Sequence, residues 1–233
     1  MISRRSVLGT ISAGGVALLA GCLEDLLDSD IDAEAEPAEF EASVVEATGF
    51  EHINTESYEI DETFDIAGED VNLRAVSWLA TYGIGSIDAD MVDEEADPDD
   101  FDHLDESDVV AATAISTPSE TFAGQEINPA GRYDTDELID EFNEEISEGN
   151  VENFERVDDI EVTILDEETE LSVFEADLNH QDEDELLEIA LYLATVQSGD
   201  DYVITAGLHH RSIEKRDELV ELVQSVEHPV DRP

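Results

Sequence analysis

Cysteine is nearly absent from this chain of 233 residues, in which Cys22 is the only one. A lone cysteine cannot form an intramolecular disulfide, and it rules out zinc sites built from several thiolates. Long apolar runs are absent as well. The apolar stretch over residues 7–21 has 15 residues, whereas a helix that crosses a bilayer needs about 20. The sequence therefore argues against both a disulfide framework and a bilayer-spanning helix.

Basic residues are almost as scarce. Lys and Arg together number 9, with Lys215 as the single lysine, against 64 Asp and Glu. No basic stripe exists to meet phosphates, so nucleic acid is excluded as a partner. Glycine-rich phosphate motifs and the Gly-x-Ser-x-Gly nucleophile motif are also absent. We therefore expect no catalytic residues and no cofactor, and predict that the protein is not an enzyme.

The excess of acidic residues indicates the salt concentration in which the chain folds. Its formal net charge is −55, yet 41% of its residues are hydrophobic and they recur periodically. That pattern favours a folded core over intrinsic disorder, the usual reading of a high net charge. Self-repulsion opposes compaction at ordinary ionic strength, whereas molar salt shortens the Debye length to about 3 Å. We predict a halophilic protein that binds solvent cations loosely.

Residues 1–21 carry the elements of an export signal in the correct order. Twin arginines precede the apolar stretch, and small residues come directly before the cysteine, as in a lipobox. The signal residues are Arg4, Arg5, Leu19, Ala20, Gly21 and Cys22. We predict twin-arginine (Tat) export, cleavage, and a lipid on Cys22 that holds the protein at the extracytoplasmic face of the cell membrane. The alternative is an N-terminal anchor helix that stays uncleaved.

The mature chain divides into a tether and one domain. Residues 22–39 are predicted to be an acidic tether, because like charges extend such a segment. Residues 40–233 follow without a Pro/Gly/Ser-rich linker and form a single domain by length. Within it, 12 of the 21 residues over 88–108 are acidic, which predicts a surface loop. A calcium loop is the alternative interpretation, but Val92 and Phe101 occupy positions that ligands would need.

Alternating apolar and polar residues predict most of the domain to be strands. Tyr58, Ile60, Phe64 and Ile66 share one parity. Residues 186–196 could also form a helix, although the turn at 198–201 favours a hairpin. The expected strands are 40–42, 50–53, 58–66, 71–82, 109–115, 161–165, 169–178, 188–196 and 202–210.

Two helices are also predicted. One starts at Asp134 with a capping pair and ends at Gly149, and the other starts at Ser212 and ends before Pro229. Their expected core residues are Leu138, Ile139, Phe142, Leu219, Val220 and Val223. Sequential strands with two inserted helices indicate an α+β fold, an antiparallel β-sheet packed on one face by the two main helices.

Histidines suggest a metal site only weakly. His209 and His210 are adjacent on a predicted strand, where neighbouring side chains point to opposite faces and cannot share one ion. The other histidines lack the spacing of a transition-metal site. We therefore expect no bound metal.

One further segment attracts attention because it contains the only tryptophan. Trp78 shares parity with Tyr82 on a predicted strand, and Asn128-Pro129 lies further along. These residues are interpreted as core packing, with an exposed recognition patch as the alternative.

The same segments carry a resemblance. Arg4-Arg5, the lipobox, residues 78–82 (Trp-Leu-Ala-Thr-Tyr), Ser116-Thr117-Pro118 and Asn128-Pro129 resemble an uncharacterised family of haloarchaeal twin-arginine-exported lipoproteins, a domain of unknown function. The hairpin at residues 200–204 and the closing residues 226–228 are similar to it as well. The resemblance implies location and fold, and it implies no catalytic residue.

These observations predict a cell-surface, lipid-anchored halophilic protein that acts as a non-enzymatic binding or interaction module. Its partner would be a surface protein, a cell-wall glycan or a small ligand, besides the membrane itself. The alternative is an extracytoplasmic enzyme or metal-assisted hydrolase that uses His209, His210 or the acidic loop.

Overall fold

Strands dominate the structure, a computed structural model. It describes residues 31–66, 69–84, 110–119, 121–122, 125–126, 151–179 and 186–232. The strands are β1 (Ile31–Glu34), β2 (Glu39–Phe40), β3 (Glu51–Ile66), β4 (Glu69–Gly83), β5 (Val110–Pro118), β6 (Thr121–Phe122), β7 (Gln125–Glu126), β8 (Val151–Ile164), β9 (Glu167–Asn179), β10 (Leu186–Ser198), β11 (Asp201–His210) and β12 (Val226–Glu227). The helices in these residues are α1 (Ala42–Thr48) and α4 (Arg216–Gln224).

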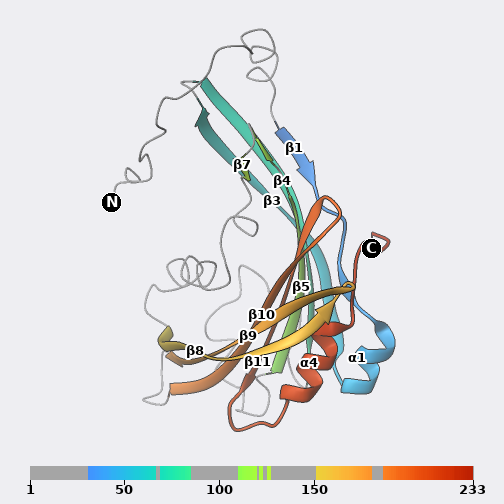
Figure 1. The fold of residues 1–233 in the computed structure, drawn as a ribbon, viewed down its shortest axis with the longest axis vertical. Coiled ribbons are helices and arrows are strands. Elements are labelled where there is room, and N and C mark those ends of the chain that lie inside the picture. Colours follow the sequence, from blue (N-terminus) through green and yellow to red (C-terminus); the bar gives the residue numbers. More distant parts are fainter. Residues whose placement is uncertain are drawn as a thin grey trace.

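Eight of the described strands form one mixed sheet in the order β1-β4-β5-β11-β10-β9-β8, with β3 paired to β4 (Figure 1). All neighbours run antiparallel except β1 and β4, which are parallel. The predicted α+β class is therefore wrong, because the fold is mainly β. The prediction failed because the strands are longer than expected. β3 alone has 16 residues, whereas α1 and α4 have 7 and 9, so polar residues that looked like breaks are solvent-facing positions of long strands.

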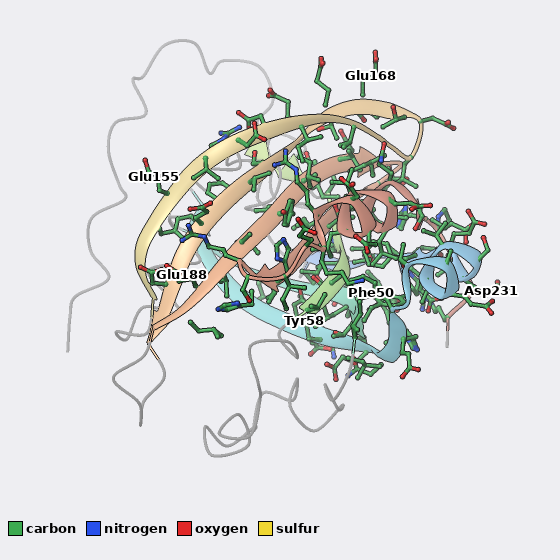
Figure 2. The ribbon with its side chains drawn as sticks, turned by 90° about the horizontal axis from the view of Figure 1, so that it is seen from below. Phe50, Tyr58, Glu155, Glu168, Glu188 and Asp231 are labelled. Carbon is green, nitrogen blue, oxygen red and sulfur yellow. The ribbon has the colours of Figure 1, made fainter. Side chains whose placement is uncertain are left out.

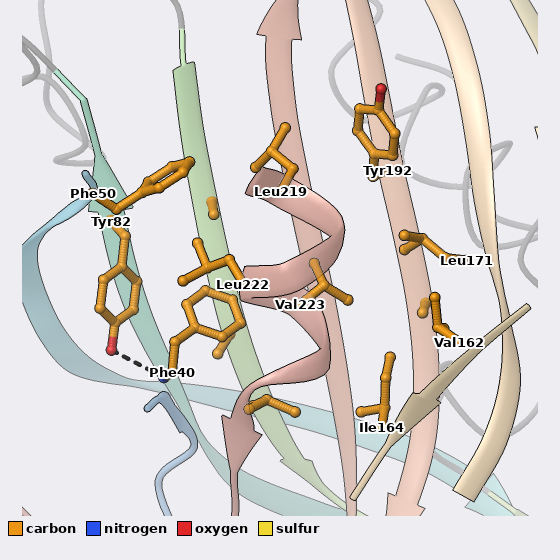
Figure 3. Packing of buried hydrophobic residues seen from close by; sticks show 14 of the residues in the cluster. Phe40, Phe50, Tyr82, Val162, Ile164, Leu171, Tyr192, Leu219, Leu222 and Val223 are labelled. Atoms are coloured by element: carbon orange, nitrogen blue, oxygen red, sulfur yellow. Dashed lines mark hydrogen bonds between the residues drawn. The ribbon is translucent and has the colours of Figure 1, made fainter. Parts of the chain in front are cut away.

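The two helices lie on the same face of the sheet, which curves around them (Figure 2). In α4, Leu219, Leu222 and Val223 are completely buried against that face (Figure 3). The prediction that Leu219, Val220 and Val223 pack on the sheet is confirmed, with Val220 partly buried at the edge of the core. The predicted helix over 134–149 lies outside the described residues, as does the acidic loop over 88–108.

Gly207 lets α4 approach the sheet. A Cβ atom at this position of β11 would lie 2.8 Å from Cδ2 of Leu219, which is closer than carbon atoms pack. Gly207 also pairs in register with Tyr192 on β10. The absence of a side chain at Gly207 therefore sets how close the helix comes to this part of the sheet.

The predicted hairpin near the C-terminus is confirmed. Residues 186–196 belong to β10, and Gly199 turns the chain into β11 with a φ of +66°. The strand expected over 109–115 extends further, because β5 ends at Pro118. Residues 42–48, next to an expected strand, form α1.

The chain joins the sheet earlier than predicted. Residues 31–38 fall within the stretch expected to be tether, yet β1 pairs with β4, and Ala33, Ala35, Pro37 and Ala38 are buried. Any tether therefore ends before Ile31. Within the described part of the chain, no helix is both long enough and apolar enough to cross a membrane.

Candidate functional site

An open pocket of about 750 Å³ lies between the helix-covered face of the sheet and the segment that joins β11 to α4. Its floor comes from three neighbouring strands, through Val173 on β9, Ala190 and Tyr192 on β10, and His209 on β11. Arg211 and residues 213–218 form its wall. A volume of this size accommodates a small organic molecule.

Tyr192 and His209 form a hydrogen-bonded pair in the floor. The Tyr192 hydroxyl lies 3.1 Å from Nε2 of His209, and the two rings stack with centroids 5.6 Å apart. Nδ1 of His209 lies 2.8 Å from the carbonyl oxygen of His210. Because a carbonyl only accepts, Nδ1 carries a proton, and in the neutral imidazole Nε2 accepts the hydroxyl proton of Tyr192. Tyr192 stands beside Leu219 at the upper end of the core in Figure 3.

Three basic side chains line the wall: Arg211, Lys215 and Arg216. They are half of the six Lys and Arg residues in the described part of the chain, gathered within six positions. Such a cluster of basic residues is exceptional in a chain with 64 acidic residues, and it shares the wall with three carboxylates, those of Glu214, Asp217 and Glu218.

Each of these cations faces a protein carboxylate. Nη2 of Arg216 lies 2.5 Å from Oδ2 of Asp158, and Nζ of Lys215 lies 3.0 Å from Oε1 of Glu218. Arg211 reaches Glu175 at 3.1 Å. All these side chains are at least a quarter exposed, so water screens the pairs and they add little to stability.

Two of the ion pairs stabilise the charged forms of Asp158, Arg216 and Glu218. The hydrogen bond from Arg216 lowers the pKa of Asp158, and the same contact raises the pKa of Arg216. The hydrogen bond from Lys215 lowers the pKa of Glu218. Burial raises the pKa of Tyr192, since a phenolate would lose its hydration there. The pocket therefore presents a neutral phenol beside charged guanidinium and carboxylate groups at neutral pH.

A second constellation lies at the other end of β11. His228 Nδ1 is 3.0 Å from Ser198 Oγ, and its Nε2 is 3.2 Å from Asp201 Oδ2 and 3.1 Å from the Glu36 carbonyl. A Ser-His-Asp set invites comparison with hydrolase triads. However, the His228 side chain is only 3% exposed, and a backbone carbonyl shares its Nε2. The arrangement ties the N-terminal segment, the β10–β11 turn and the C-terminus together.

The predicted histidine geometry agrees with the structure. His209 faces the helices with Val203, Thr205 and Gly207, whereas His210 is the next residue of the strand and contacts Ser212. Among the described residues, no three His, Cys, Asp or Glu side chains gather as metal ligands.

Trp78 and Tyr82 serve packing in the described structure. The Trp78 indole N–H donates to the carbonyl of Ala35 at 3.1 Å, and Tyr82 is 2% exposed. Asn128 and Pro129 lie outside the described residues, as do Arg4, Arg5 and the lipobox with Cys22.

Sequence reasoning missed the pocket. The sequence pattern predicts only that Tyr192 belongs to a strand, and its proximity to His209 depends on the register of β10 against β11. One signal was available, however. Residues 211–216 contain three of the nine basic residues of the chain, and such clustering against an acidic background marks a site.

A comparison with protein families matches residues 37–227 to a domain of unknown function, DUF6517. The chain belongs to the DUF6517 family. The match confirms the expectation of a domain of unknown function, and no curated protein matches the chain. The whole pocket lies inside the DUF6517 domain, whereas β1 precedes it.

Proposed function

We propose that this DUF6517 protein is a Tat-exported lipoprotein of a haloarchaeal cell, and that it displays a binding pocket on the cell surface. Arg4-Arg5 and the lipobox before Cys22 support export and lipid attachment. The charge of −55 supports a medium of molar salt. Binding of a small ligand is favoured over binding of a protein or glycan, because the described site is a pocket of about 750 Å³.

One observation carries this proposal: the pocket and the point where the chain joins the sheet lie at opposite ends. His209, in the floor of the pocket, pairs with Val110 on β5. The carbonyl of Val110 accepts the N–H of Ile84, the residue after β4. The pocket therefore lies at the level of the C-terminal end of β4. Ile31 pairs with Leu73, eleven residues earlier in β4. At about 3.3 Å per residue, the two ends are roughly 35 Å apart along the strands. An anchor on the N-terminal side would leave the pocket facing away from the membrane.

A second candidate, an extracytoplasmic enzyme, is favoured by the Tyr192–His209 pair. A hydroxyl bonded to an imidazole in a pocket is an arrangement that can transfer protons. The two functions separate cleanly in an experiment. Turnover of a bound compound that Tyr192→Phe abolishes would support the enzyme, whereas binding without turnover supports the module.

Anchoring is tested by comparing the wild type with Cys22→Ser in a haloarchaeal host. We expect wild-type protein to fractionate with membranes and to lack residues 1–21 by mass spectrometry. Cys22→Ser should leave the membrane fraction, because no sulfur is present to take the lipid. A matched control, Arg4→Lys with Arg5→Lys, keeps the charge and should retain the protein inside the cell.

The opposite result is equally clear. If wild type and Cys22→Ser both stay with the membranes and both keep residues 1–21, the N-terminus is an uncleaved anchor and the lipoprotein proposal fails.

A further inference from the structure

We infer that the pocket binds a small amphipathic organic acid, with one carboxylate held by the cations of the wall and an apolar body held at the mouth. This inference rests on the proposed binding function and names the ligand class for the same pocket. It draws on the charge of the wall, the exposure of the apolar lining residues and the net charge of the chain.

The wall supplies the contacts that an anion needs. Arg211, Lys215 and Arg216 line the pocket, and their side chains are 26–49% exposed, so a ligand can reach them. The rest of the chain repels anions, because acidic residues outnumber basic ones 64 to 9. An anion is therefore held only by direct contact with these cations, and not by long-range attraction.

A single carboxylate fits this wall better than a phosphate dianion. Four acidic side chains line the same pocket: Glu175, Glu214, Asp217 and Glu218. These carboxylates repel negative charge on the ligand, so a dianion is repelled about twice as strongly as a monoanion. Planar guanidinium groups such as that of Arg216 also match the geometry of a carboxylate. Asp158, its present partner, is 48% exposed and can turn toward solvent when a ligand carboxylate takes its place.

The apolar body follows from two side chains. Val157 on β8 lines the pocket and is 47% exposed, which makes it one of two large exposed hydrophobic residues in the described chain. Ile213, on the segment after β11, also lines the pocket and is partly buried. In molar chloride, a site made of charge alone would be filled by chloride. An organic acid competes because its carbon chain covers Val157 and Ile213, and apolar burial stays favourable in salt.

Hexanoate is a suitable probe, measured by isothermal titration calorimetry on the full mature chain in 3 M KCl. We expect hexanoate to bind, and hexanamide and hexylamine to bind at least about tenfold more weakly, because they lack the anionic end. Acetate should also bind at least about tenfold more weakly, since it has too few carbons to cover the mouth of the pocket.

Variants locate the site. Arg211→Gln and Arg216→Gln should each weaken hexanoate binding on the order of tenfold, and Val157→Thr should weaken it by a smaller factor. Arg74→Gln is the matched control, because Arg74 also forms an exposed ion pair, with Glu59, but lies outside the pocket lining. Circular dichroism of each variant separates lost binding from lost folding.

Any of three results would overturn the inference. Equal affinities for hexanoate and hexanamide would show that the wall does not select an anion. Equal losses in Arg216→Gln and Arg74→Gln would place binding elsewhere. If a neutral compound instead bound in the pocket and Val157→Thr weakened it, the ligand class named here would be wrong while the proposed binding function would stand.

Discussion

At the scale of single residues, Tyr82 carries a polar atom into the core beneath the helices. Its hydroxyl accepts the backbone N–H of Phe40 at 3.2 Å, and the two rings lie 4.9 Å apart. Burial raises the pKa of Tyr82 from 10.0 to about 12, because a phenolate would lose its hydration in the core. A raised pKa favours the folded state fully below pH 10, and this contribution is lost as the pH rises from 10 to 12.

The Tyr82→Phe variant should therefore lose less stability than the wild type between pH 10 and pH 12. A shift of two pKa units corresponds to at most about 3 kcal/mol in the free energy of unfolding. Denaturant unfolding in molar salt at several pH values measures the difference. Tyr202→Phe is the control, because Tyr202 lies on β11 and points to the face of the sheet opposite the helices. Parallel pH profiles for wild type and Tyr82→Phe would contradict this account of the buried phenol.

At the scale of elements, the turn between β8 and β9 is strained. Leu165 and Asp166 have φ angles of +50° and +65°, and Ile164 pairs with Glu167 across the turn. A two-residue hairpin with two positive φ angles is a type I′ turn, which glycine and asparagine adopt far more easily than leucine. The hairpin forms because its long strands outweigh this local cost.

Asp166→Gly should raise the free energy of unfolding by about 1 kcal/mol, because glycine removes the left-handed strain. Asp200→Gly is the control, since it removes the same carboxylate from the β10–β11 turn, where Gly199 already has the positive φ angle. Chemical denaturation of both variants checks the prediction. Equal effects would show that lost charge, and not relieved strain, causes the change.

The elements show what could be predicted and what could not. Turn residues and alternation located β4, β9, β10 and β11, because local chain geometry determines both signals. The predicted α+β class was wrong because acidic residues occupy solvent-facing positions of long strands, where they look like breaks between shorter strands. The sequence also does not show which face of β11 packs on the helices. Ile204 and Ala206 on one side, and Val203 and Thr205 on the other, are all at least partly buried.

The pocket lay beyond sequence reasoning for a related reason. Tyr192 and His209 are 17 positions apart, and only the strand register brings them within 3.1 Å. The basic cluster at 211–216 was visible in the chain, yet its meaning depends on the strands that lie beneath it.

At the scale of the whole molecule, net charge decides the conditions of folding. The full chain carries a formal net charge of −55, so the domain should unfold or expand as salt is diluted, because screening falls with ionic strength. Circular dichroism from molar KCl to low salt measures this. Sucrose at matched osmolality is the control, since it favours compact states without screening charge. A cooperative fold that persists in low salt would show that self-repulsion is weaker than the composition predicts.

In the proposed arrangement, the lipid anchor and the pocket lie at opposite ends of the molecule. Energy transfer from a donor dye to acceptor lipids tests it in lipoprotein reconstituted into vesicles. Asp32→Cys and Val157→Cys each provide a single labelling site, because Cys22 carries the lipid in the proposed mature protein. The account predicts clearly higher transfer from position 32 than from position 157. Equal transfer from both positions, or higher transfer from position 157, would contradict it.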